Sequence, residues 1–183
     1  PMNTLDWIVF VLKHGGQFIL CTIGCMCILA LHRVPSLKDA PLFSIIRVLM
    51  ILDIIVMIAT RIHDIPSEVL SKEALGEPFV TIILIIQCIR WFGQLLALPI
   101  LSILHYLGVY RPIIIRHMTL VHAYLIVLAI LVASIAFTVP MLTECCGFIY
   151  YEQGNYWAYD YTKPGTALYN QMNLVLQVST FIV

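Results

Sequence analysis

The sequence predicts an all-α fold, a polytopic bundle of transmembrane helices. Hydrophobic residues make up 61% of the 183 residues and charged residues only 11%, whereas soluble domains carry roughly 25% charged residues. The mean hydropathy is +0.97. The apolar residues also gather into runs of roughly 20 or more, the length that a helix needs to cross a hydrocarbon core of about 30 Å. We therefore expect one transmembrane domain embedded in a lipid bilayer.

Five apolar runs define the expected helices. The first run contains Lys13, His14 and Gln17 near its start, and Lys13 can reach the nearby membrane interface by snorkelling. This run lacks the basic segment and the small-residue cleavage site of a secretory signal, so we expect it to remain as a helix. The fifth run is expected to be incomplete at Val183. The expected spans are Trp7 to Leu31, Leu42 to His63, Pro78 to Leu107, Met118 to Leu142 and Leu168 to Val183.

Basic residues in the short connections predict the orientation. Arg33, Lys38 and Arg47 flank the first connection, and Arg111 and Arg116 flank the third. Short loops rich in Lys and Arg usually face the cytoplasm. The second and fourth connections are acidic or rich in tyrosine. We therefore expect a multi-pass protein of the plasma membrane with its N-terminus outside.

The long connection from Thr143 to Ala167 is rich in aromatic residues. Connections of this length are unusual unless they bind something or are disordered. Aromatic side chains suit a recognition surface, because they combine a large contact area with a polar group. They equally suit an interfacial belt that rests on lipid headgroups. The aromatic residues in question are Tyr150, Tyr151, Tyr156, Trp157, Tyr159 and Tyr161.

The segment from Ser102 to Pro112 carries a family resemblance. It resembles the inner end of the third helix in rhodopsin-like (family A) G-protein-coupled receptors, which usually reads Ser-Ile-Asp-Arg-Tyr-Leu-Ala-Val, one variable residue, Arg-Pro. Leu104 and His105 stand in place of the Asp-Arg pair. The matching residues are Ser102, Ile103, Tyr106, Leu107, Val109, Arg111 and Pro112.

Other spans match the same family in part. Leu49 to Asp53 resembles the family's Leu-Ala-x-Ala-Asp, with Asp53 on the conserved aspartate. The family's spacing places Gly24 and Cys25 on the Gly-Asn pair of the first helix, so Cys25 is a departure. Pro140 matches a proline near the outer end of the fourth helix. The resemblance covers the whole chain in topology and implies the N-terminal part of a receptor, through the start of the fifth helix.

The resemblance implies that His105, Tyr106, Arg111 and Pro112 face a heterotrimeric G protein in the full-length receptor. His105 replaces the arginine that engages the G protein. An imidazole still donates hydrogen bonds and titrates near neutral pH. Alternatively, the replacement shows that this position has drifted and that coupling is reduced or altered. The residues leave both readings open.

Gln87 takes the outer position of the third helix at which amine receptors carry an aspartate. A cationic amine would have no counter-ion there, so the resemblance favours an extracellular peptide or a non-amine small molecule as the ligand. In overall character the chain resembles divergent nematode-type chemoreceptors and FMRFamide-like peptide receptors. The alternative is that Gln87 hydrogen-bonds a neighbouring helix, as polar residues in bundles often do.

Asp53 and Arg90 lie within apolar spans, where an ionised side chain costs several kcal/mol unless it is paired or hydrated. In the family, the position of Arg90 borders a sodium pocket around the second-helix aspartate. We hypothesise that Arg90 pairs with Asp53 as an intramembrane switch, with Gln94 one turn deeper. The alternative is that Arg90 snorkels to the outer headgroups, about 18 Å away if the helix starts at Pro78.

The six cysteines divide by expected compartment, with only Cys145 and Cys146 in an outer loop. In the family, an outer-loop cysteine bonds to one at the top of the third helix, but Val80 stands there, and Cys88 lies deeper. The usual disulfide is therefore not expected. Adjacent cysteines bond to each other only with strain. Free thiols, an intermolecular bridge and a partner elsewhere all remain open for this pair.

Several function classes receive no support from the residues. The net charge is zero, so no basic face for nucleic acid is indicated. His117 and His122 are five residues apart and miss the spacing of paired metal ligands on a helix. We expect no enzyme, no metal and no cofactor. The rival class is a small transporter or channel subunit, with an aqueous path lined by Asp53, Gln87, Arg90 and Gln94.

Overall fold

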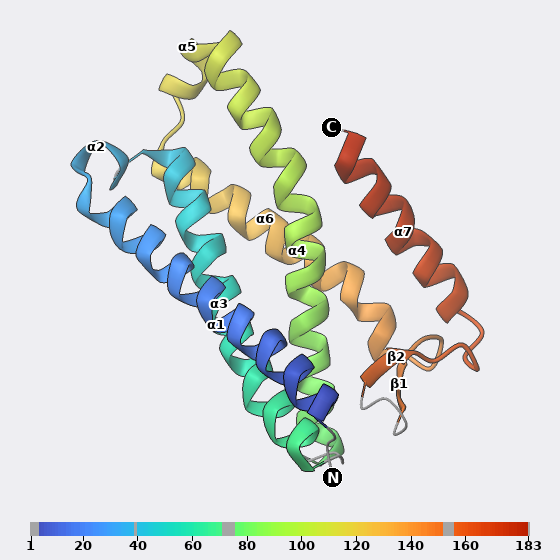
Figure 1. Cartoon of the computed structure of the whole chain (residues 1–183). Helices are drawn as coiled ribbons and strands as arrows, with labels where there is room; N and C mark the ends of the chain where they lie inside the picture. The colour runs from blue at the N-terminus through green and yellow to red at the C-terminus, as the bar shows by residue number, and fades with distance from the viewer. Residues whose placement is uncertain (1–3, 39, 71–75, 152–155, 183) are drawn as a thin grey trace. The chain divides into compact units, whose positions relative to one another are not determined.

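The computed structural model describes residues 4–38, 40–70, 76–151 and 156–182, and it confirms the all-α fold class (Figure 1). Four helical segments in these ranges are long and apolar enough to cross a membrane. They belong to α1 (Thr4–Arg33), α3 (Pro41–Leu70), α4 (Glu77–Tyr110), and α6 (Leu120–Thr138) with the 3₁₀ turn η1 (Val139–Leu142). The chain divides into two compact units, Pro1–Leu84 and Ile85–Val183.

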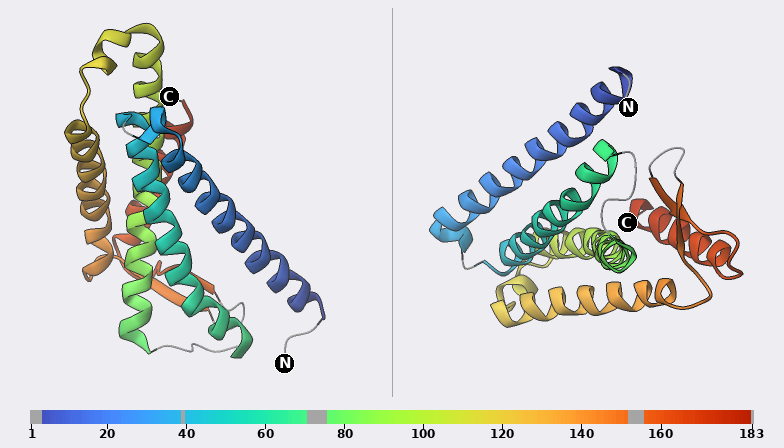
Figure 2. Two further views of the ribbon diagram at one scale, coloured as in Figure 1. Left: turned by 90° about the vertical axis from the view of Figure 1, so that its left-hand side faces the viewer. Right: turned by 90° about the horizontal axis from the view of Figure 1, so that it is seen from below.

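The first unit is built on an antiparallel pair, α1 and α3, joined through the short helix α2 (Pro35–Lys38) (Figure 2). Gly24 lies where the two long helices approach each other. A methyl group added there would lie 3.2 Å from the Cδ1 atom of Ile54. Small residues allow such close approach between helices in membranes, where packing replaces the hydrophobic effect as the driving force.

Helix α3 is longer than its apolar run and continues past His63 to Leu70. Pro66 lies inside the helix, and the next residue, Ser67, donates a hydrogen bond of 2.9 Å to the His63 carbonyl. The first acidic residues after His63, which were expected in a loop, therefore lie on α3. Asp64 and Glu68 are four residues apart and share one helix face. Both carboxylates contact basic partners, Arg61 at Asp64 and Lys13 at Glu68.

The second unit contains most of α4, the short helix α5 (Pro112–Arg116), α6, a β-hairpin and α7 (Thr166–Ile182). The hairpin pairs β1 (Phe148–Tyr151) antiparallel with β2 (Tyr156–Tyr159), with Phe148 opposite Tyr159. It lies where α6 ends and α7 begins, whereas α5 lies at the far end of α4 (Figure 1). Strands were not expected in this connection.

The core of the second unit is an aromatic cluster that joins α4, α6, the hairpin and α7. Phe92 stacks on Phe137 at a centroid distance of 5.4 Å, and Tyr169 meets Phe92 edge-on at 6.0 Å. Gly93 brings α4 close to α6, since an added methyl group would lie 3.4 Å from the Ser134 hydroxyl oxygen. The buried members of the cluster are Phe92, Leu95, Cys146 and Tyr169.

The aromatic residues of the long connection divide between two surroundings. Tyr159 is half-buried, stacks on Phe148 at 5.3 Å and meets Tyr169 at 6.1 Å. Tyr151 and Tyr161 are exposed. The side chains of the remaining predicted aromatics, Tyr150, Tyr156 and Trp157, lie outside what the structure describes. Tyr159 therefore packs into the protein core, while a recognition surface and a lipid belt both stay open for the exposed rings.

Candidate functional site

A charged cluster joins α1 to the last turns of α3. Lys13 forms an ion pair with Glu68, and the Nε2 atom of His14 lies 3.1 Å from the other Glu68 oxygen. Arg61 lies 3.0 Å from the Nδ1 atom of His14 and 2.8 Å from Asp64. Lys13 is thus engaged by a carboxylate, an arrangement that the expected snorkelling did not include. The sequence carried a signal for this contact, because consecutive spans run antiparallel and acidic residues follow His63.

An apolar groove with a volume of about 490 Å³ lies between α1 and α3 beside this cluster. His14, Gln17 and Arg61 are polar residues of its lining. Gln17 and Arg61 each carry a buried atom without a hydrogen-bond partner, Oε1 and Nε respectively. The groove is lined by His14, Gln17, Phe18, Cys21, Met57, Ile58, Arg61, Ile62, Ile65 and Pro66. Sequence reasoning did not identify it, because a groove depends on how two helix faces meet.

A hydrogen-bond chain connects α4, α7 and the hairpin. The indole N–H of Trp91 donates to Asn173 at 2.9 Å, and the Asn173 amide donates to the Tyr159 hydroxyl at 3.2 Å. Burial raises the pKa of Tyr159, which keeps its hydroxyl neutral. Gln87 is half-buried and lies four residues before Trp91, on the same face of α4. The tryptophan inside an apolar span was a usable signal, because its indole N–H is a hydrogen-bond donor that usually finds a partner.

The predicted switch residues are divided between the two units. Asp53 lies on α3 in the first unit, and Arg90 and Gln94 lie on α4 in the second. All three are half-buried, and none is without an interaction partner. Pairing of Arg90 with Asp53 stays a prediction.

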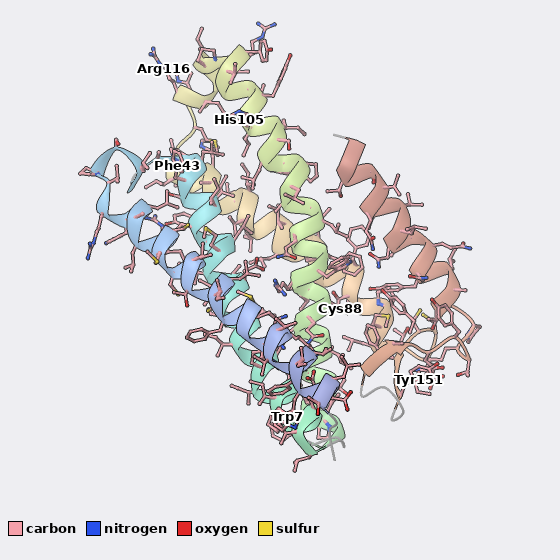
Figure 3. All side chains as sticks on the ribbon, in the orientation of Figure 1. Trp7, Phe43, Cys88, His105, Arg116 and Tyr151 are labelled. Carbon is pink, nitrogen blue, oxygen red and sulfur yellow. The ribbon has the colours of Figure 1, made fainter. Side chains whose placement is uncertain are left out.

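The residues expected to face a G protein lie at the end of α4 and the start of α5. His105 and Tyr106 are exposed, and the Tyr106 ring packs on Tyr110 at 4.6 Å. Arg111 is the N-cap residue of α5, and Pro112 is its first residue. Proline suits this position because the first helical N–H has no partner within the helix. Figure 3 shows His105 and Arg116 at this same end of α4 and α5.

All six cysteines are free thiols in the structure. Cys145 and Cys146 face each other with their Sγ atoms 2.7 Å apart. Val80 is buried on α4, and Cys88 is half-buried on the same helix. Among the residues whose placement is described, no three His, Cys, Asp or Glu side chains gather as a metal site requires.

Comparisons with known proteins show the fold of the chain. No protein-family model matches the chain, and no curated protein matches it by sequence. The structure is similar to the crystal structure of squid rhodopsin, with a TM-score of 0.72 at 16% sequence identity. The match covers 97% of this chain and 52% of the rhodopsin chain, so the chain spans about half the length of that protein. The chain has the fold of half of a rhodopsin-like seven-helix receptor.

Proposed function

We propose that the chain is part of a G-protein-coupled receptor that senses an extracellular ligand and signals to a heterotrimeric G protein. The observation that carries this proposal is the rhodopsin-like fold over 97% of the chain. The segment from Ser102 to Pro112, which resembles the family's third-helix motif, adds support. Because the match spans about half of rhodopsin, signalling belongs to a polypeptide that also supplies the remaining helices.

The proposed ligand is a peptide or another molecule without an amine cation, as in nematode-type chemoreceptors or FMRFamide-like peptide receptors. Gln87 offers an amide in place of a carboxylate, and the hydrogen-bond chain through Trp91, Asn173 and Tyr159 begins one turn away on α4. Amide and hydroxyl groups match the hydrogen-bonding groups of a peptide. A carboxylate would be required to neutralise an amine.

The proposed receptor lies in the plasma membrane with its N-terminus and hairpin outside. Its G-protein surface comprises His105, Tyr106, Arg111 and Pro112. The exposure of His105 and Tyr106 supports this assignment, as does the short helix that starts at Pro112, where Ile113 is 69% exposed.

The first test is to read the coding sequence beyond Val183 and to express the complete protein with a reporter G protein. Two or more further apolar spans and a response to peptides, with none to biogenic amines, are expected. Gln87→Ala should weaken the ligand response about tenfold or more, as loss of a buried hydrogen bond implies. The matched control is Gln171→Ala on an exposed face of α7. A stop directly after Val183, or a response to amines alone, would overturn the proposal.

The proposed switch pair has its own test. Asp53→Ala and Arg90→Ala each leave one charge inside the membrane, so each should abolish surface expression. If the two residues pair, the double variant recovers expression. Purely additive losses would exclude the pair. Ion or solute flux through liposomes that carry the purified chain, lost in Asp53→Asn, would instead favour the transporter or channel alternative.

A further inference from the structure

The segment between η1 and β1 holds two adjacent thiols in different surroundings. Cys145 is exposed, whereas Cys146 is 2% exposed and belongs to the aromatic core of the second unit. Their Sγ atoms are 2.7 Å apart, and the Thr143 hydroxyl donates to the Cys145 sulfur at 3.2 Å. One thiol is therefore open to a reagent, and the second lies directly beneath it.

The backbone around the two cysteines is held by the segment that leads into α7. The N–H of Gly165 donates to the Cys145 carbonyl, and the Lys163 ammonium donates to the Cys146 carbonyl, both at 2.9 Å. A methyl group at Gly165 would lie 2.9 Å from the Cys145 carbonyl oxygen and 3.2 Å from the Cys146 sulfur. One at Gly147 would lie 2.7 Å from the Lys163 nitrogen. The absence of side chains at both glycines leaves the space that these contacts occupy.

We propose that Cys145 and Cys146 form a redox-active dithiol site that exchanges with low-molecular-weight disulfides and closes reversibly to a disulfide between adjacent residues. In the first step, the Cys145 thiolate attacks a disulfide RS–SR, forms Cys145–S–S–R and releases RS⁻. In the second step, Cys146 attacks the Cys145 sulfur, closes the Cys145–Cys146 bond and releases RSH, its thiol proton going to the leaving sulfur. Both cysteines are oxidised, and one RS–SR is reduced to two thiols.

The environments of the two thiols agree with these roles. Hydrogen bonds from the Cys146 thiol and the Thr143 hydroxyl hold the pKa of Cys145 below its usual range, and the nearby Lys163 ammonium adds to this effect. Burial raises the pKa of Cys146 to about 11. Thiolate is the attacking form, so the exposed cysteine reacts first and the buried one resolves the adduct.

Closure is expected to be reversible and to change the packing of the hairpin. Adjacent Cα atoms are about 3.8 Å apart across a trans peptide, whereas unstrained disulfides join Cα atoms roughly 4.4–6.8 Å apart. Strained disulfides are easily reduced and are typical of regulatory sites. Cys146 packs in the cluster with Phe92 and Tyr169, and the Cys145 carbonyl accepts a hydrogen bond from Gly165, the residue before α7. Oxidation therefore alters how the hairpin rests on α4 and α7.

The test uses the purified chain in lipid nanodiscs, treated with oxidised glutathione after reduction and then alkylated. Mass spectrometry of the unreduced digest should find the Cys145–Cys146 peptide two hydrogen atoms lighter and unalkylated, and dithiothreitol should restore both thiols. A lasting glutathione adduct in the wild-type chain, a bond to Cys88, or a dimer linked through either cysteine would overturn the proposal. This readout needs no substitution and does not depend on receptor activity.

Two variants separate the roles of the thiols, with Cys88→Ser as the matched control. Cys146→Ser should accumulate the glutathione adduct on Cys145, because the resolving thiol is absent. Cys145→Ser should react with oxidised glutathione at least about tenfold more slowly than the wild type, because the remaining thiol is buried and protonated. Cys88→Ser should close the 145–146 bond at the wild-type rate. Equal adduct levels in wild type and Cys146→Ser would contradict resolution by Cys146.

Discussion

His14 makes a different contact through each ring nitrogen. The distances place Glu68 at Nε2 and Arg61 at Nδ1. A guanidinium can only donate, so Nδ1 accepts its hydrogen bond and Nε2–H donates to the carboxylate. The imidazole thus lies between a cation and an anion, with its Nε2 atom facing the carboxylate. Glu68 also pairs with Lys13, so it is the shared partner of two neighbouring residues of α1.

Glu68→Gln should lower the free energy of unfolding by about 1–2 kcal/mol, since it removes a charged acceptor that is only partly exposed. The thermal midpoint of the chain in nanodiscs measures the change. A double-mutant cycle with His14→Phe, which keeps a ring beside Phe10, isolates the coupling between the two residues. The control is Glu144→Gln in the exposed segment before β1. An equal shift in both glutamine variants would contradict a specific role for Glu68.

The two adjacent thiols should also differ in their pH dependence. Because the pKa of Cys145 is lowered, its thiolate persists to lower pH than that of an ordinary cysteine. Cys146, with a pKa of about 11, stays protonated until strongly alkaline pH. Alkylation by iodoacetamide, followed by mass spectrometry between about pH 6 and pH 10, should modify Cys145 first at every pH. Faster modification of Cys146 at neutral pH would show that its thiol is not buried.

At the scale of elements, the contact between α1 and α3 depends on a residue without a side chain. Gly24 faces Ile54 at a distance that a single methyl group would fill, whereas Gly15 on the same helix has nothing within 4 Å of an added methyl group. The two glycines therefore differ in packing while sharing the same helical backbone. This difference makes them a matched pair for testing whether the helices meet as described.

Gly24→Leu should destabilise the chain by about 1–3 kcal/mol, because a larger side chain forces α1 away from α3. Gly15→Leu should be neutral or stabilising by up to about 1 kcal/mol, since leucine favours the helix more than glycine does. Thermal unfolding in the same nanodiscs compares the two variants. If Gly15→Leu is as damaging as Gly24→Leu, the helix contact lies elsewhere.

At the scale of the whole molecule, the alternation of spans predicts on which side of the membrane each connection lies. The hairpin segment and the N-terminus are proposed to share one side, and α5 with its basic residues the other. In intact cells, a membrane-impermeant maleimide should label Cys145, which is exposed. A cysteine introduced by Arg116→Cys should be labelled only after permeabilisation. Cys145→Ser is the control for the first label, and the reverse pattern would invert the topology.

The amino-acid sequence by itself determined the fold class, because each helix follows from a local apolar run that is long enough to cross a bilayer. The contiguous motif also predicted a functional surface at His105 and Tyr106, and that assignment stays a prediction. The Asp53–Arg90 pair, which links different helices, stays a prediction. Local information identified what could span the membrane and which polar residues needed a partner there.

Only the tertiary structure decided which distant residues meet. The last turns of α3 carry Glu68, and Lys13 and His14 of α1 contact it there. Likewise, Cys146 is buried because α4 and α7 meet the hairpin around it. Neither result follows from local hydropathy, because each contact forms between segments far apart in sequence. The physical reason is that a polar residue inside a helix bundle is stabilised by a partner side chain. The packing of the helices determines which residue that partner is.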